Sequence, residues 1–310
     1  MRQWIRHDDK SFVFSLRDLI SFIAILPIDG TRQDITEGSS IPEVGRIMLR
    51  LRSVNDKDDT QTREAGGFST IILAAGKGTR MKSDLAKVLH PLCGVPMLTY
   101  PVAAAQAAGS GKIVVVIGHQ AEQIREKFRD QGLIFVEQRE LLGTGHAVLQ
   151  AAKAFRDHDG TIVILCGDVP LILPGTVKTL YERHRSARAA VTVLTTIPEE
   201  PAGYGRVVKA ADGHVLKIVE ERDATMDEKN IREINTGIYC VESGFLFTAV
   251  AALGNRNAQG EYYLTDIMEI ACKNGLRTTS FPAPDPMEVM GINTPEELER
   301  AGRRMGARDL

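Results

Sequence analysis

The chain has 310 residues, of which 43% are hydrophobic and 25% are charged, so it holds enough apolar material for a full globular core. Its formal net charge of -2 argues against binding to nucleic acid or to an anionic membrane surface. The four cysteines are widely spaced without a C-x-x-C pair. This spacing indicates neither a zinc site nor a disulfide framework, and it fits a reducing cytoplasm.

The first 66 residues differ from the rest in composition. Their longest apolar run, residues 19–28, is too short to span a bilayer, and its acidic flanks do not fit a signal peptide. Residues 30–67 mix charged and small residues without periodicity, which predicts loop or disorder. We therefore expect an N-terminal extension over 1–66 and one domain over 67–310. Two origins of the extension stay open, an artefactual upstream start codon and an added module.

From Phe68 onward, apolar runs alternate with amphipathic patterns, which predicts an α/β fold. Strands are expected at 70–75, 112–117, 134–136, 161–166, 190–196 and 235–241. Helices are expected at 97–108, 121–129, 144–155, 174–186, 244–252, 264–274 and 294–305. Such a Rossmann-like, mainly parallel sheet has helices on both faces and binds ligands at the carboxyl ends of its strands.

The first predicted strand opens into a basic glycine loop with the sequence LAAGKGTRM, followed by Lys87. Gly76 and Gly78 allow backbone N–H groups to approach an anion, while Arg80 and Lys87 supply positive charge for a polyphosphate. A dinucleotide fingerprint is excluded because Met81 stands where the third glycine is needed. No P-loop sequence is present either. An ordinary basic turn remains the alternative to a nucleoside triphosphate site.

Further motifs follow in chain order: QRELLGTGHA from Gln138, LCGDVPL from Leu165, GYGR from Gly203, IVEERDAT from Ile218, and EINTGI, NAQGEYYLTD and GIN beyond them. With the glycine loop, these motifs resemble the sugar-phosphate nucleotidylyltransferases over residues 68–301. The resemblance is strongest to the uridylyltransferase domain of the bacterial N-acetylglucosamine-1-phosphate uridylyltransferases. It implies transfer of UMP from UTP to N-acetylglucosamine 1-phosphate, with release of pyrophosphate.

The implied reaction needs no general base, because the sugar phosphate is already an anionic nucleophile. The resemblance assigns Arg80, Lys87 and Asp168 to catalysis, and it makes Asp168 and Asn293 the protein ligands of Mg²⁺. Two protein oxygens leave positions for water and phosphate, as Mg²⁺ prefers. The alternatives are a helix N-cap or turn residue for Asp168, a helix cap for Asn293 and a solvated pair for the two cations. The histidines, His146 among them, then need no catalytic role.

The resemblance also assigns the substrate contacts. Gln138 is the candidate reader of uracil, because a primary amide offers a donor and an acceptor side by side. The remaining nucleotide contacts are Leu73, Ala74, Ala75, Gly76, Gly78, Lys87, Gly143, Thr144 and Gly167. The sugar side comprises Gly205, Glu220, Asn235, Tyr263 and Thr265. Plain helix initiation at 143–144 and a solvated pair at 220–221 stay open, although adjacent strand residues should face opposite sides.

No hexapeptide repeat follows the last predicted helix. We therefore expect neither acetyl transfer nor the β-helix trimer of bifunctional relatives, and we leave the oligomeric state open. UTP and a sugar 1-phosphate are the expected partners, with no nucleic acid and no membrane. Two other functions stay open: the same chemistry on another sugar 1-phosphate with UTP or dTTP, and a non-catalytic nucleotide-binding regulatory protein.

Overall fold

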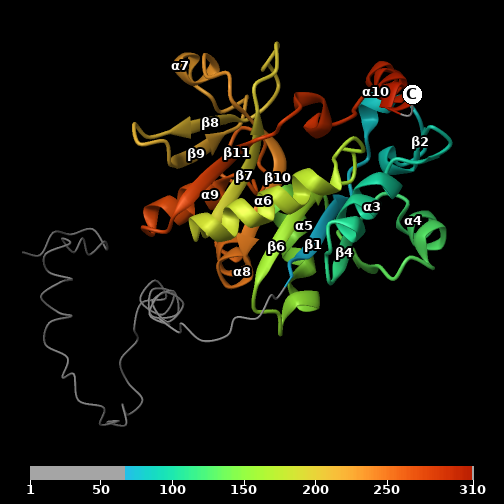
Figure 1. The fold of residues 1–310 in the computed structure, drawn as a ribbon, viewed down its shortest axis with the longest axis horizontal. Helices are drawn as coiled ribbons and strands as arrows, with labels where there is room; N and C mark the ends of the chain where they lie inside the picture. Colours follow the sequence, from blue (N-terminus) through green and yellow to red (C-terminus); the bar gives the residue numbers. More distant parts are fainter. Residues whose placement is uncertain (1–66, 309–310) are drawn as a thin grey trace, which may run out of the picture. The chain divides into compact units, whose positions relative to one another are not determined.

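The computed structural model describes residues 67–308. The predictions for residues 1–66, including the apolar run at 19–28, lie outside this part. A nine-stranded mixed sheet forms the centre of the fold, in the order β11-β7-β10-β6-β1-β4-β5, and a β8–β9 hairpin joins it through β10 (Figure 1). The strands are β1 Ser69–Ala74, β4 Ile113–Ile117, β5 Ile134–Glu137, β6 Thr161–Cys166, β7 Val191–Thr196, β8 Arg206–Lys209, β9 Val215–Val219, β10 Ile234–Glu242 and β11 Thr278–Pro282.

The pairing in the centre of this sheet is parallel, as predicted. Strand β1 pairs in parallel with β4 on one side and with β6 on the other, and β4 pairs in parallel with β5. Strand β10 is the exception, because it runs antiparallel to both β6 and β7. The carboxyl ends of β1 and β6 therefore lie side by side at one edge, where a parallel sheet binds ligands.

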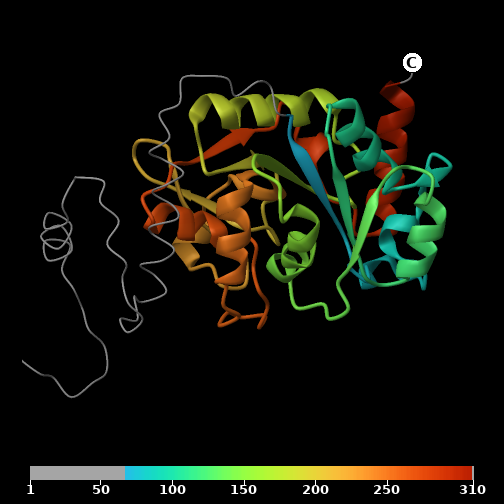
Figure 2. The same ribbon diagram turned by 90° about the horizontal axis from the view of Figure 1, so that it is seen from below.

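Helices cover both faces of the sheet, and Figure 2 shows the sheet edge-on between these two layers. Alternate residues of each strand pack into two separate cores, because successive side chains of a strand point to opposite faces of the sheet. Ile71 and Val114 pack under α5, α8 and α9, whereas Ile72 and Val115 pack under α3, α4 and α6. The helices are α3 Thr99–Ala107, α4 Ala121–Phe128, α5 Thr144–Gln150, α6 Pro174–Ala187, α7 Met226–Lys229, α8 Ser243–Ala251, α9 Asp266–Lys273 and α10 Pro295–Arg308.

The predicted elements are present, with two kinds of difference. The helix expected over 144–155 ends at Gln150 and continues as a 3₁₀ helix, Ala151–Phe155. The β8–β9 hairpin, β11 and a small sheet of β2 Pro91–Leu92 with β3 Val95–Pro96 were not predicted. Within residues 67–308, no helix is long and apolar enough to cross a membrane.

Candidate active site

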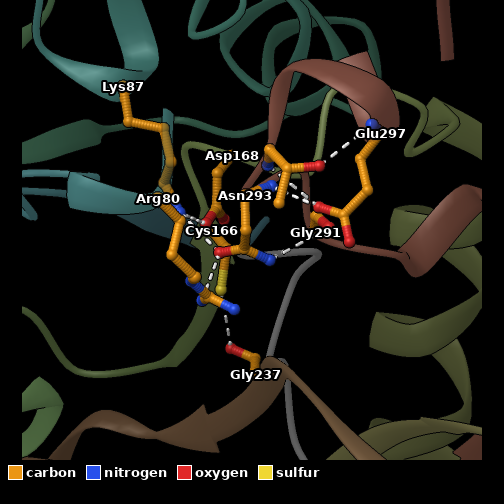
Figure 3. A network of polar contacts seen from close by, with 9 residues as sticks. Arg80, Lys87, Cys166, Asp168, Gly237, Gly291, Asn293 and Glu297 are labelled. Atoms are coloured by element: carbon orange, nitrogen blue, oxygen red, sulfur yellow. Dashed lines mark hydrogen bonds and ion pairs between the residues drawn. The ribbon is translucent and has the colours of Figure 1, made fainter. Parts of the chain in front are cut away.

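Four polar side chains from distant parts of the chain converge beside the carboxyl ends of β1 and β6 (Figure 3). Lys87 forms an ion pair with Asp168, which follows β6, and its ammonium group also donates to Asn293 Oδ1 at 3.0 Å. Arg80 Nη2 donates to the same oxygen at 2.7 Å. Two cations therefore meet one carboxylate and one amide oxygen at the sheet edge where the sequence predicts a triphosphate.

The glycine loop holds Lys87 through close packing against Gly78. Gly78 has φ +66°, and a Cβ atom there would lie 2.4 Å from Lys87 Cβ. Such a separation is far below van der Waals contact, so a larger residue would displace the lysine. The glycine therefore permits both the left-handed backbone and the approach of the lysine stem.

Asn293 is placed by the first turn of α10 and is not its cap. The cap is Thr294, whose hydroxyl accepts from Glu297 N at 3.2 Å, while Glu297 Oε2 accepts from the backbone N–H groups of Asn293 and Thr294 at 2.6 and 3.2 Å. The Asn293 amide is thus left to face Lys87 and Arg80. Ile292 N donates to Asp168 O at 2.8 Å, which ties this turn to the end of β6.

The oxygens of Asp168 and Asn293 fit a divalent cation. Both lie within hydrogen-bond reach of one ammonium group, so they already converge on a single positive charge. A carboxylate and an amide oxygen are ligands suited to Mg²⁺, which keeps several waters. Within residues 67–308, no cluster of three or more His, Cys, Asp or Glu side chains forms a fuller metal site.

A cavity of about 270 Å³ opens beside this cluster. Most of the predicted nucleotide contacts line it: Leu73, Ala74, Ala75, Gly76, Lys87, Gln138, Gly143 and Thr144. The predicted metal ligand Asp168 lines it too. Gly78 lies under Lys87 instead, and Gly167 packs tightly with its N–H donating to Leu73 O at 2.8 Å. Cys166 and Glu261 also line the cavity and were not among the predicted site residues. The motifs LCGDVPL and NAQGEYYLTD contained both.

Gln138 is buried in the wall of this cavity, and its amide nitrogen has two polar neighbours within hydrogen-bond distance. Its Nε2 atom lies 3.0 Å from Gly143 O and 3.1 Å from His146 Nδ1. Gly143 has φ +110°, and a Cβ atom there would lie 2.7 Å from Tyr262 O. Glycine is therefore required by the close approach of the Tyr262 backbone.

The residues predicted for the sugar form a second cluster. Glu220 bonds the Thr265 hydroxyl at 3.1 Å, and Asn235 N donates to Gly205 O at 2.9 Å. Glu220 and Glu221 follow the end of β9 and are not within a strand, which corrects the expected strand pattern. They still diverge: Glu221 accepts from Arg206 at 2.8 Å, away from Thr265. Tyr263 is buried, and its hydroxyl bonds Asp223 and Gln259.

The two clusters are linked through the cavity wall. Thr144 Oγ1 accepts from Leu264 N at 3.1 Å, and Cys166 Sγ contacts Gly237 O at 3.4 Å. Gly237 N in turn donates to Asn235 Oδ1 at 2.9 Å, so one short chain of contacts joins the end of β6 to the predicted sugar residue. Burial raises the pKa of the Cys166 thiol, and the Asp168 carboxylate adds to the effect, which keeps this thiol protonated.

Burial also perturbs the acidic groups near the predicted sugar residues. It raises the pKa of Glu220, and the carboxylates of Asp266 and Asp223 add to the rise while Thr265 opposes it. The pKa of Asp266 is raised to about 6 by burial and then by its neighbours Glu269 and Asp223. Such raised values mean that the folded protein tolerates negative charge poorly here, so hydroxyl donors of a ligand would be favourable partners.

Comparison with known proteins identifies the family. Residues 70–231 match the family described as "MobA-like NTP transferase domain". The chain is 56% identical over 239 residues to "Bifunctional protein GlmU" of Geobacter metallireducens, a match that covers 77% of this chain and 50% of that protein. A protein of the same name from Desulfotalea psychrophila is 47% identical, with 78% and 71% covered. The chain thus spans about half the length of the first curated relatives it matches.

Solved structures show the same fold. A UDP-glucose pyrophosphorylase complexed with UDP-glucose superposes with a TM-score of 0.61 at 18% identity, covering 78% of this chain and 99% of the other. A nucleotidyl transferase from Methanothermobacter superposes with a TM-score of 0.56 at 20% identity, covering 79% and 100%. The resemblance expected from the motifs is therefore confirmed, and the chain belongs to the family of MobA-like NTP transferase domains as a nucleotidylyltransferase.

Proposed function

We propose that the chain transfers UMP from UTP to N-acetylglucosamine 1-phosphate in the presence of Mg²⁺, which yields UDP-N-acetylglucosamine and pyrophosphate. The observation that carries this proposal is the convergence of Arg80, Lys87, Asp168 and Asn293 beside a cavity walled by Gln138. The relatives named GlmU, at 52–56% identity, favour this sugar over others.

In this reaction a phosphate oxygen of the sugar phosphate attacks the α-phosphorus of UTP. A new P–O bond forms, the bond from the α-phosphorus to the bridging oxygen breaks, and pyrophosphate leaves. The nucleophile is already an anion, so the protein need only align the two substrates and stabilise charge. Arg80 and Lys87 supply fixed positive charge for the triphosphate and for the leaving pyrophosphate.

Asp168 and Asn293 would hold the metal ion. When bound, Mg²⁺ would neutralise phosphate charge and polarise the α-phosphate. The ion pair with Lys87 holds the Asp168 carboxylate in position, and Glu297 holds the backbone of Asn293. In the cavity, Gln138, Gly143 and Thr144 would contact uracil. The residues that would contact the sugar are Gly205, Glu220, Asn235, Tyr263 and Thr265.

Pyrophosphate release by the purified protein tests the proposal. UTP, dTTP and CTP should be crossed against glucose, galactose and N-acetylglucosamine 1-phosphates, with and without Mg²⁺. Release confined to UTP with N-acetylglucosamine 1-phosphate, and only with Mg²⁺, is the expected result. Release with another pair would keep the mechanism and change the substrate, and no release from folded protein that binds UTP would favour a regulatory role.

A further inference from the structure

We propose that Gln120 is a positioning residue for the glycine loop: its side-chain amide holds the segment between Arg80 and Lys87, and so holds the two cations in place for the triphosphate. The inference rests on the proposed function, because it takes Arg80 and Lys87 as the triphosphate cations. It adds to that function a residue from the turn between β4 and α4, which was not among the predicted site residues.

The Gln120 amide binds two backbone groups of the loop. Its Oε1 atom accepts from Ala86 N at 2.7 Å, and its Nε2 atom donates to Asp84 O at 2.9 Å. A backbone N–H can only donate and a carbonyl oxygen can only accept, so these two partners fix which way the amide points. Ala86 is buried, so its N–H would be costly to leave unpaired. Gln120 thus satisfies the backbone donor that immediately precedes Lys87.

The same turn also contacts the start of the glycine loop. His119 N donates to Ala75 O at 3.2 Å, and a Cβ atom on Gly118 would lie 2.8 Å from that oxygen. His119 Nε2 adds a longer contact of 3.4 Å to Asp84 O. Strands β1 and β4 are parallel neighbours, which brings their carboxyl ends to the same edge of the sheet. Residues 118–120 therefore hold the loop at both of its ends.

The backbone of Gln120 shows that its side chain serves the loop and not its own helix. Its φ of +55° lies in the left-handed region, which is unfavourable for a residue other than glycine. Gln120 is the N-cap of α4, yet its side chain makes no capping hydrogen bond. A strained residue persists where the surrounding structure requires it, and such residues are concentrated at functional sites. Here the two hydrogen bonds to the loop supply that requirement.

The contact acts on the cations through the short segment that it holds. Ala86 is the N-cap of the 3₁₀ helix Lys87–Leu89. Arg80 and Lys87 donate to the same oxygen, Asn293 Oδ1, at 2.7 and 3.0 Å. The shape of the chain between the two cations sets how they are placed relative to each other. A displacement of about 1 Å at such a site can lower a rate about hundredfold.

Equilibrium binding of UTP and UMP tests the inference without requiring turnover. Gln120→Ala removes both hydrogen bonds and keeps a Cβ atom, so the backbone strain stays. It should weaken UTP binding about tenfold, the range expected for one to two hydrogen bonds. Binding of UMP should stay within about twofold, because UMP lacks the β- and γ-phosphates that Arg80 and Lys87 would hold. Gln106→Ala is the matched control, since the Gln106 amide on α3 donates to Gln131 O at 3.4 Å, and it should change neither affinity.

Gln120→Gly separates positioning from stability. Glycine adopts a φ of +55° without strain, so this variant should be at least as stable in urea as Gln120→Ala. It should nevertheless lose UTP affinity to the same extent, because it lacks the same two hydrogen bonds. In steady-state assays of either variant, KM for UTP should rise about tenfold, whereas KM for the sugar 1-phosphate should stay within about twofold.

A double-mutant cycle with Ala86 tests the contact itself. Ala86 has φ −53°, which suits proline, and Ala86→Pro removes the N–H that Gln120 accepts. This substitution should weaken UTP binding in the wild-type protein and should weaken it no further in Gln120→Ala. Additive losses would overturn the inference.

Two other results would also overturn it: an unchanged UTP affinity in both Gln120 variants, and an equal loss of affinity for UTP and UMP. Wild-type protein that binds UTP but releases no pyrophosphate would contradict the proposed function alone, and the binding measurements would still decide the role of Gln120. Wild-type protein that binds neither nucleotide would contradict both proposals.

Discussion

Asp168 is the residue on which the proposed chemistry depends most directly. It lies at the end of β6, pairs with Lys87 and supplies a carboxylate to the predicted metal site. We expect Asp168→Ala to lower kcat/KM for pyrophosphate release by about 10³-fold, a loss typical of removing electrostatic stabilisation from a transition state. Asp212→Ala, in the β8–β9 turn, is the control and should retain activity. Near-normal turnover in Asp168→Ala would remove this residue from the metal site.

Substitution of Gly78 by alanine tests whether Lys87 must stay in place. Gly78→Ala introduces a left-handed alanine, which costs about 1–2 kcal/mol, and forces its Cβ against Lys87. Gly213→Ala carries the same backbone cost at φ +88° but meets no atom within 4 Å. In urea, Gly213→Ala should lose only this backbone cost, and Gly78→Ala should lose more because of the clash with Lys87. Only Gly78→Ala should lose kcat, by about tenfold or more. Equal activity in the two would show that the lysine position is not critical.

At the scale of elements, the first turn of α10 holds Asn293 in position. Glu297→Ala removes the acceptor for the backbone N–H groups of Asn293 and Thr294 and should cost about 1 kcal/mol. It should also raise the Mg²⁺ concentration needed for half-maximal rate several-fold. Glu299→Ala, which removes only an exposed ion pair with Arg303 on the same helix, should change neither quantity. An unchanged Mg²⁺ requirement in Glu297→Ala would contradict this positioning role.

Asp266, at the start of α9, lowers the stability of the folded protein in a pH-dependent way. The pKa of Asp266 is about 6 in the folded protein and 3.8 in its reference state. Its contribution to the free energy of unfolding is therefore highest below pH 3.8, where the carboxyl group is protonated in both states, and it falls as pH rises through 6. Asp266→Asn should therefore stabilise the protein at pH 7.5, by about 1 kcal/mol once solvent screening is allowed for. The gain should shrink toward pH 4.5 in thermal melts. A gain that is independent of pH would contradict the raised pKa.

The elements that the sequence predicted are those with long apolar runs. Strands β1, β4 and β6 are buried on both faces, so their composition alone identifies them. Strands β8 and β9 are short and half-buried, and β11 is largely polar, so their pairing depends on tertiary contacts. Sequence reasoning misses such strands because no local period separates them from loops.

The candidate site was also predictable only in part. The loop after β1 and Asp168 after β6 follow from the rule that parallel strands present their carboxyl ends together. Asn293 stands 206 positions from Lys87, and no spacing argument joins them; the resemblance supplied that pairing. No catalytic role was expected for His146, and its contact with Gln138 depends on how α5 is rotated against the end of β5, which no local pattern predicts.

At the scale of the whole molecule, the sheet and α10 complete one site. Strand β10 returns antiparallel between β6 and β7 and brings Asn235 toward Gly205, while α10 carries Asn293 back to the first loop. The site residues described here therefore lie between positions 73 and 293, within the part of the chain that the structure describes.

A chain shortened to residues 67–310 should therefore keep its activity. The family match begins at residue 70, and none of the proposed catalytic or binding residues precedes Leu73. We expect kcat and KM for UTP to stay within about twofold of the full chain, since no proposed contact to either substrate is removed. Pyrophosphate release by both proteins, at matched concentration of folded protein, measures this. A loss of kcat beyond about tenfold would show that residues 1–66 contribute to catalysis, and a higher KM alone would assign them to substrate binding.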